Sequence, residues 1–151
     1  MDRDFIHLGP SQIEGTGVFA KRKIPRGTRI LEYTGDRVPT GRVEAVADAG
    51  GPRVYGFALS EALVIDGTRN GNECRFVNHS CAPNCEMYVF DERAYLYAMR
   101  DIHRGEELTF DYRLGSADPA PPAELDQAQY RCRCGAAACR GTLLAPIGDS
   151  T

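Results

Sequence analysis

Short runs of β-branched and aromatic residues recur along the chain, and glycine, proline and aspartate separate them. Runs of this kind, bounded by turn-forming residues, are typical of short β-strands. Strands are therefore expected at 17–24, 29–35, 54–59, 62–66, 85–90, 94–102 and 107–112. Residues 41–50 instead predict a short helix, because Val43, Val46 and Ala47 fall on one helical face and Gly50 can end it. The sequence thus predicts a mainly β domain with little helix.

The composition of the chain changes at residues 115–129, which are rich in proline, alanine and acidic residues and carry no periodic apolar pattern. Such a segment is expected to be a mobile connector. Residues 130–144 hold too few apolar side chains to fold alone and would need a cross-link or a metal. The chain has 151 residues, which fits one main domain with one core.

Three cysteines within 130–144 can supply that cross-link. Cys132, Cys134 and Cys139 form a C-x-C-x4-C pattern, which allows three thiolates to converge on one metal ion. A structural zinc site needs four ligands, so a fourth has to come from elsewhere in the chain. The candidates are Cys74, Cys81, Cys85, His79 and His103. The alternative is that the three are small apolar residues in a tail that binds nothing.

The start of the chain, MDRDFIHLGPSQ, carries two acidic residues and no apolar stretch of the kind found in secretory signals. An intracellular location is therefore expected, cytoplasmic or, in a eukaryote, nuclear. In such a reducing compartment, clustered cysteines bind metal or act in catalysis more often than they form disulfides. No apolar run approaches the roughly 18 residues that cross a bilayer, so no membrane partner is expected.

The charge of the chain argues against direct contact with nucleic acid. The formal net charge is −3, and no run of lysine and arginine is longer than the three residues at 21–23. Nucleic-acid-binding domains usually carry a basic patch or stripe. A net negative charge suits a basic protein partner better.

Residues 74–85, CRFVNHSCAPNC, concentrate cysteine, histidine and asparagine in a short stretch. Three roles are compatible with them: a zinc knuckle, a cysteine–histidine nucleophilic site, or a clamp for a cofactor. No acyl-transfer signature surrounds Cys81, which weakens the nucleophile interpretation. The residues alone leave the other two roles open.

Five blocks, in this order along the chain, resemble the SET-domain protein lysine methyltransferases. They are EGTGVFA (14–20), ILEYTG (30–35), YGFAL with VIDGTRNGNECRFVNHSCAPNC (55–59 and 64–85), YAMRDIHRGEELTFDY (97–112) and CRCGAAACRGTL (132–143). The resemblance implies a SET domain at 5–114, the connector at 115–129 and a post-SET zinc segment at 130–144. It also implies several short β-sheets and a pseudoknot-like C-terminal region, with residues 74–85 threaded through a loop formed near 107–112.

The resemblance also assigns residues to a cofactor, a metal and a reaction. It implies S-adenosylmethionine as cofactor, one structural Zn²⁺, and a catalytic Tyr112 whose hydroxyl orients the methyl group and the amine. The resemblance also places Phe110 and Tyr55, a ligand-contacting tyrosine, among the catalytic residues. The implied cofactor contacts are Glu14, Thr16, Gly17, Tyr55, Asn78, His79, Arg133 and Leu143, and the implied metal ligands are Cys81, Cys132, Cys134 and Cys139. Cys74 and Cys85 are expected to be buried in the core.

The function implied by the resemblance is transfer of methyl groups from S-adenosylmethionine to the ε-amine of a lysine in a basic, histone-like or other protein. Phe110 stands where the family carries Phe or Tyr, and Phe leaves room for a methylated nitrogen to turn, so di- or trimethylation is expected. A monomer is expected. The alternative is a catalytically silent, zinc-stapled interaction module with the same fold. The joint presence of Tyr55, Asn78, His79 and Tyr112 argues against that alternative.

Overall fold

The structure, a computed structural model, describes residues 5–13, 15–39, 46–48, 51–53, 56–60 and 62–112, together with 134, 136, 137 and 139. Over these residues the chain consists of short strands and loops, with a 3₁₀-helical turn, η2, at Glu73–Phe76. The strands are β1 (Ile6–Pro10), β2 (Thr16–Ala20), β3 (Arg29–Tyr33), β4 (Asp36–Pro39), β5 (Val46–Asp48), β6 (Gly51–Arg53), β7 (Gly56–Ala58), β8 (Leu63–Asp66), β9 (Asn78–His79), β10 (Cys85–Phe90), β11 (Arg93–Ala98) and β12 (Thr109–Phe110). This confirms the predicted mainly β domain of several small sheets.

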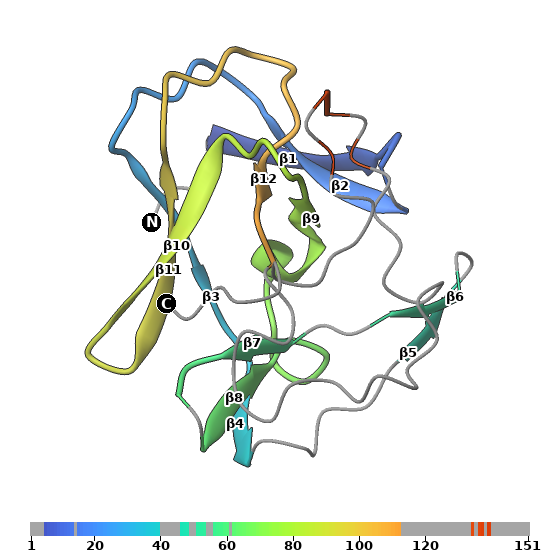
Figure 1. Cartoon of the computed structure of the whole chain (residues 1–151), viewed down its shortest axis with the longest axis vertical. Helices are drawn as coiled ribbons and strands as arrows, with labels where there is room; N and C mark the ends of the chain where they lie inside the picture. Colours follow the sequence, from blue (N-terminus) through green and yellow to red (C-terminus); the bar gives the residue numbers. More distant parts are fainter. Residues whose placement is uncertain are drawn as a thin grey trace.

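A three-stranded antiparallel sheet, in the order β10-β11-β3, forms one wall of the core (Figure 1). Its inner face carries the fully buried Ile30 and Leu96. Ile102 and Leu108, which follow β11 in the chain, join the same cluster. Burying side chains of this size stabilises the fold by about 1.5–3 kcal/mol each. The core therefore holds the turn that leads from β11 into β12.

Two further antiparallel sheets lie around this core. β1 pairs with β2, and β8 lies between β4 and β7 in a second three-stranded sheet. The predicted strand at 17–24 ends at Ala20, and the one at 94–102 ends at Ala98. Beyond both ends the chain forms an isolated bridge between Ile24 and Ile102, with two backbone hydrogen bonds of 2.8 Å. A single bridge replaces the longer strands because the chain turns at each of these ends.

The helix expected at 41–50 is wrong for residues 46–48. Val46–Asp48 is strand β5, and it pairs antiparallel with β6. Isolated helices of about ten residues are marginal in water, and the β-branched Val46 favours a strand. The glycines at 50 and 51 suit a tight reversal between two strands. The other residues of the expected helix lie outside those described.

β9 and β12 form a two-stranded parallel ladder in the middle of the molecule (Figure 1). Thr109 lies opposite Asn78 and Phe110 opposite His79, and the Ser80 N–H donates to the Phe110 carbonyl at 3.2 Å. On the other edge of β12, the Asn84 side chain accepts from the Thr109 N–H at 2.9 Å and donates to the Glu107 carbonyl at 2.8 Å. Residues 78–84 therefore hold β12 along both edges. These contacts bring 74–85 and 107–112 together as the resemblance implies, and the threading itself stays a prediction.

The boundaries expected at 5–114, 115–129 and 130–144 also stay predictions, because residues 113–133 lie outside the described part of the chain. In the described part, no helix is long and apolar enough to cross a membrane.

Candidate functional site

Tyr112 follows β12 and is held at two points by the β9 segment. Its hydroxyl donates to the Val77 carbonyl at 2.5 Å, and its backbone N–H donates to His79 Nδ1 at 3.0 Å. The rings of His79 and Tyr112 meet edge to face, with centroids 5.4 Å apart. A partly buried phenol fixed at its ring, its hydroxyl and its backbone is well placed to orient a reacting group.

Aromatic side chains surround Tyr112 on its β12 side. The ring of Phe110, which is 6% exposed, lies 4.9 Å from that of Tyr112. Phe57 of β7 packs edge-on against Phe110 at 6.4 Å, and Tyr33 of β3 lies 5.7 Å from Phe57. The four rings thus form a continuous aromatic cluster that runs from Tyr33 to Tyr112. Tyr55, assigned to this region by the resemblance, lies outside the described residues.

Asn78, which is 2% exposed, is the centre of a buried polar network. Its side-chain amide donates to Glu107 Oε2 at 2.9 Å, to Ser11 Oγ at 3.1 Å and to the Thr16 carbonyl at 3.4 Å. The Ser11 hydroxyl lies 2.9 Å from both oxygens of the Glu107 carboxylate. This network joins the β1–β2 connection, β9 and the start of β12. The contacts fix the orientation of the Asn78 amide.

Sequence reasoning missed Ser11 and Glu107. Ser11 is in a loop and belongs to none of the five blocks, and Glu107 is one of two adjacent acids before LTFDY. The only available signal was the position of Glu107 within the fourth block, 97–112. The two residues are 96 positions apart in the sequence, so no local sequence pattern could indicate that their side chains meet.

Gly17 in β2 lies directly against the same carboxylate. It faces Gly9 of β1 across the sheet, and a methyl group added at Gly17 would lie 2.5 Å from Glu107 Oε2. The same methyl group at Gly9 would only touch the Phe19 ring at 3.5 Å. The absence of a side chain at Gly17 therefore allows β2 to approach Glu107. Of the other two predicted contacts in this motif, Thr16 begins β2 and Glu14 lies outside the described residues.

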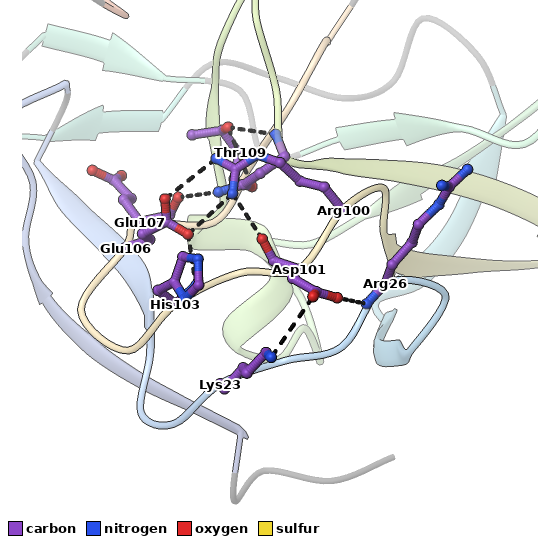
Figure 2. Close-up of polar contacts among 9 residues, drawn as sticks. Lys23, Arg26, Arg100, Asp101, His103, Glu106, Glu107 and Thr109 are labelled. Carbon is purple, nitrogen blue, oxygen red and sulfur yellow. Dashed lines mark hydrogen bonds and ion pairs between the residues drawn. The ribbon is translucent and has the colours of Figure 1, made fainter.

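A surface cluster of charges fixes the turn before Glu107 (Figure 2). Glu106 pairs with Arg100 at 3.1 Å and accepts from the His103 N–H at 2.7 Å. Partial burial opposes ionisation of Glu106, but these two partners outweigh it and lower the pKa of the carboxyl. The Arg26 N–H lowers the pKa of Asp101 in the same way. His103 is exposed in this cluster and is not among the described residues whose ligand atoms converge, so it is a poor candidate for the fourth metal ligand.

Cys81, Cys134 and Cys139 form the metal-binding candidate of the described residues. Their three sulfur atoms lie within 4.8 Å of one another, and none of the described cysteines is in a disulfide. Tetrahedral zinc with Zn–S bonds of about 2.3 Å needs sulfur atoms about 3.8 Å apart, which is compatible with this spacing. The soft, convergent donors fit Zn²⁺. Cys132, the fourth implied ligand, lies outside the described residues.

Cys74 and Cys85 lie away from this cluster and are completely buried, in agreement with their expected packing role. Burial raises the pKa of both thiols, that of Cys85 to about 12. Since only the thiolate is strongly nucleophilic, both side chains are expected to be inert in the folded protein.

The first prediction concerns these two thiols. Iodoacetamide at pH 8 is expected to leave Cys74 and Cys85 unmodified in the native protein and to alkylate both in denaturant, as measured by peptide mass spectrometry. Unfolding returns their pKa values toward the ordinary 9.0. The unfolded chain then binds fewer protons at alkaline pH, so the free energy of unfolding should decrease as pH rises above about 9. Rapid native alkylation of either thiol would contradict this.

Of the cofactor and catalytic residues expected from the sequence, the structure brings Thr16, Gly17, Asn78, His79, Phe110 and Tyr112 into one connected region, with Cys81 two residues beyond His79. Arg133 and Leu143, like Glu14, Tyr55 and Cys132, lie outside the described residues.

Comparison with known proteins agrees with this arrangement. A family model described as the SET domain matches residues 15–113. The chain belongs to the SET-domain family. This confirms the membership predicted from the five sequence blocks, and the mainly β fold of small sheets is that of the SET domain.

Relatives of this SET domain carry names of enzymes. "Histone-lysine N-methyltransferase, H3 lysine-4 specific" of Schizosaccharomyces pombe is 38% identical over 146 residues, which is 91% of this chain. "Histone-lysine N-methyltransferase 2B" of Homo sapiens is 39% identical over 91% of the chain, and "Histone-lysine N-methyltransferase ash1" of Drosophila melanogaster is 40% identical over 86%. The chain spans only 15%, 5% and 6% of the lengths of these three proteins.

Proposed function

We propose that this SET domain is a protein-lysine N-methyltransferase that uses S-adenosylmethionine. The observation that carries the proposal is Tyr112, which is fixed at its hydroxyl and its backbone beside the Phe110 ring, against which Phe57 packs in turn. The relatives named as histone-lysine N-methyltransferases support it, since they align with nearly the whole of this chain.

The chemistry requires a neutral amine in line with the methyl group that S-adenosylmethionine supplies when bound. A lysine has an ordinary pKa of about 10.4, so it is mostly charged near neutral pH. An apolar aromatic environment such as that of Phe57 and Phe110 favours the neutral amine. The proton of the Tyr112 hydroxyl is used by Val77, so its oxygen can act as an acceptor that orients the amine and the methyl C–H groups. Tyr112 therefore works by alignment.

Asn78 is proposed to bind the amino-acid end of the cofactor. Its amide nitrogen donates to Glu107, Ser11 and Thr16, so its carbonyl oxygen is the end suited to accept from an ammonium group. The His79 backbone is proposed to contact the adenine edge of the cofactor. The backbone of Thr16 and Gly17 is proposed to lie near its methionine moiety. Glu14, Tyr55, Arg133 and Leu143 complete the proposed contacts.

Zn²⁺ is proposed to be held by Cys81, Cys132, Cys134 and Cys139. When bound, it would supply a structural cross-link between the β9 segment and the C-terminal cysteines. This is supported by the three convergent sulfur atoms among the described residues.

The second prediction tests the metal. Metal analysis of the purified protein is expected to find one zinc per chain, and chelation should weaken binding of S-adenosylhomocysteine while the β core stays folded. Calorimetry measures the affinity and circular dichroism the fold. A protein that binds the ligand equally well with and without zinc would contradict the cross-link.

The substrate is proposed to be a lysine in a basic protein segment. The names of the relatives point to histones, and the net charge of −3 favours a basic partner. A monomer without nucleic-acid contacts remains the expectation from the sequence.

The third prediction concerns how many methyl groups the protein transfers to each lysine. With S-adenosylmethionine and a basic lysine-containing peptide array, mass spectrometry is expected to show di- and trimethyl-lysine, because Phe110 has no hydroxyl to crowd the amine. Phe110→Tyr should shift the product toward monomethyl-lysine. Phe90→Tyr is the matched control, since Phe90 is 71% exposed on the β10–β11 hairpin and should leave the product unchanged. Monomethyl-lysine alone from the wild type under excess cofactor would contradict the assignment.

The competing silent module makes a different prediction for the same protein. It would bind no S-adenosylhomocysteine, so calorimetry with that ligand separates the two functions before any substrate is known.

A further inference from the structure

The side chain of His79 lies between the proposed metal ligand Cys81 and the proposed catalytic residue Tyr112. His79 is 2% exposed, so water does not compete for its ring nitrogens. Nδ1 lies 3.0 Å from the Tyr112 backbone nitrogen, and Nε2 lies 3.3 Å from Cys81 Sγ. A single imidazole thus contacts both sites at once. The proposed cofactor contact of this residue uses its backbone, so the side chain has a separate role.

The partners of the ring determine where its proton is. Nδ1 accepts a hydrogen bond from the Tyr112 N–H, so its lone pair is directed at that group. A neutral imidazole with an acceptor at Nδ1 carries its hydrogen on Nε2. Nε2–H then points at Cys81 Sγ, and the separation of 3.3 Å suits an N–H···S hydrogen bond. The ring is therefore a neutral donor toward the sulfur and an acceptor toward Tyr112.

The carboxylate of Asp111 also lies near the ring. Its Oδ1 lies 3.6 Å from Nδ1, which is longer than the distance of 3.0 Å to the Tyr112 nitrogen. At that length the carboxylate is not the hydrogen-bond partner of Nδ1 in this arrangement. The Tyr112 N–H therefore occupies the acceptor site of the ring.

A hydrogen bond to a metal-bound thiolate orients that ligand and tunes its donor strength. On the opposite side of the ring, the bond to the Tyr112 N–H fixes the backbone that carries the phenol. Loss of the metal would leave Cys81 without its fixed position, and the imidazole would lose one of its two anchors.

We propose that His79 is a positioning residue that links the Cys81 metal ligand to the Tyr112 backbone through its two ring nitrogens. Through this link, binding or loss of metal at the cysteines would change how firmly the Tyr112 backbone is held. This inference rests on the proposed function, which supplies the roles of Cys81 and Tyr112, and it goes beyond it by assigning the His79 side chain.

Two substitutions separate the ends of the link. In His79→Asn, the amide oxygen can occupy the place of Nδ1 and accept from Tyr112, but nothing reaches Cys81. In His79→Gln, the amide nitrogen can reach the place of Nε2 and donate to Cys81, while the acceptor for Tyr112 is lost. His103→Asn is the matched control, because His103 is exposed in the Arg100–Glu106 cluster.

The first readout is the rate of zinc release to a colorimetric chelator. His79→Asn is expected to release zinc faster, because removing a hydrogen-bond partner of a metal ligand usually weakens metal affinity about 10- to 100-fold. His79→Gln and His103→Asn should bind zinc much as the wild type does. Equal zinc release from His79→Asn and the wild type would overturn the bond to Cys81.

The second readout is hydrogen exchange at the Tyr112 amide, followed by NMR without cofactor or substrate. His79→Gln should speed it about tenfold or more, since one hydrogen bond is lost. Removing zinc from the wild type should also speed exchange at the Tyr112 amide. In His79→Asn, which has already lost its contact with Cys81, removing zinc should change that rate little. The Thr109 amide is the internal control, because it lies in the same β9–β12 ladder but donates to Asn84 Oδ1 and not to the His79 ring.

Exchange at Tyr112 that is indifferent to zinc in the wild type would overturn the inference, and so would equal acceleration at Thr109. The wild-type comparison needs no variant, so a substitution that fails to fold does not decide the matter. A wild type that binds no zinc overturns the link together with the metal site. Methyl transfer is scored in a separate assay, so failure of the link leaves the methyltransferase proposal standing.

Discussion

Replacing Tyr112 by phenylalanine is expected to lower the methyl-transfer rate about 100- to 1000-fold, the usual cost of removing one preorganised polar group from an active site. The substitution removes only the hydroxyl that donates to Val77, and it keeps the ring against Phe110 and His79. The backbone bond to His79 also survives, so the fold should be preserved. Labelled S-adenosylmethionine and a methyl-accepting peptide measure the rate.

Tyr88→Phe is the matched control for this change. Tyr88 lies on β10, is 51% exposed, and donates its hydroxyl to Glu86, so the same deletion should leave the rate unchanged. Binding of S-adenosylhomocysteine by Tyr112→Phe should stay near the wild-type affinity, because the hydroxyl acts on the reacting groups. Equal rates for Tyr112→Phe and the wild type would remove Tyr112 from the mechanism.

The sequence predicted the strands whose pattern is local. Residues 29–35, 62–66 and 85–90 are rich in β-branched or aromatic residues, and they contain β3, β8 and β10. β1 was not predicted, because IHLGP mixes a histidine, a glycine and a proline and depends on pairing with β2. β9 has only two residues, so no periodicity could identify it. The expected helix at 41–50 failed at 46–48 because a strand partner at 51–53 follows directly.

The candidate site shows the same division. Tyr112, Asn78 and Cys81 were found because ordered motifs resemble a family, and the structure places the first two on facing segments. The Ser11–Glu107 contact could not be predicted, since it joins two loops that no local pattern relates. Asn84 was also missed as the group that bonds the second edge of β12. Polar residues that position a site depend on the tertiary fold, so sequence spacing does not reveal them.

Adding a methyl group at Gly17 is expected to weaken cofactor binding about 10- to 100-fold, or roughly 1.4–2.8 kcal/mol, because it displaces the carboxylate that orients the Asn78 amide. In Gly17→Ala the new carbon would lie 2.5 Å from Glu107 Oε2, so the carboxylate has to move. That movement strains its hydrogen bonds to Asn78 and Ser11. Calorimetry with S-adenosylhomocysteine measures the affinity, and thermal unfolding shows whether the fold persists.

Gly9→Ala is the control that isolates the cause. Gly9 faces Gly17 in the same two-stranded sheet, yet its added methyl group would meet only the Phe19 ring at an ordinary 3.5 Å. Both variants lose the same glycine flexibility on adjacent strands, so a general effect on β1 and β2 would weaken binding equally in the two. A loss confined to Gly17→Ala locates the effect at Glu107 and, through it, at the Asn78 amide. Equal affinities for Gly17→Ala and the wild type would mean that the carboxylate can move without disturbing the cofactor site.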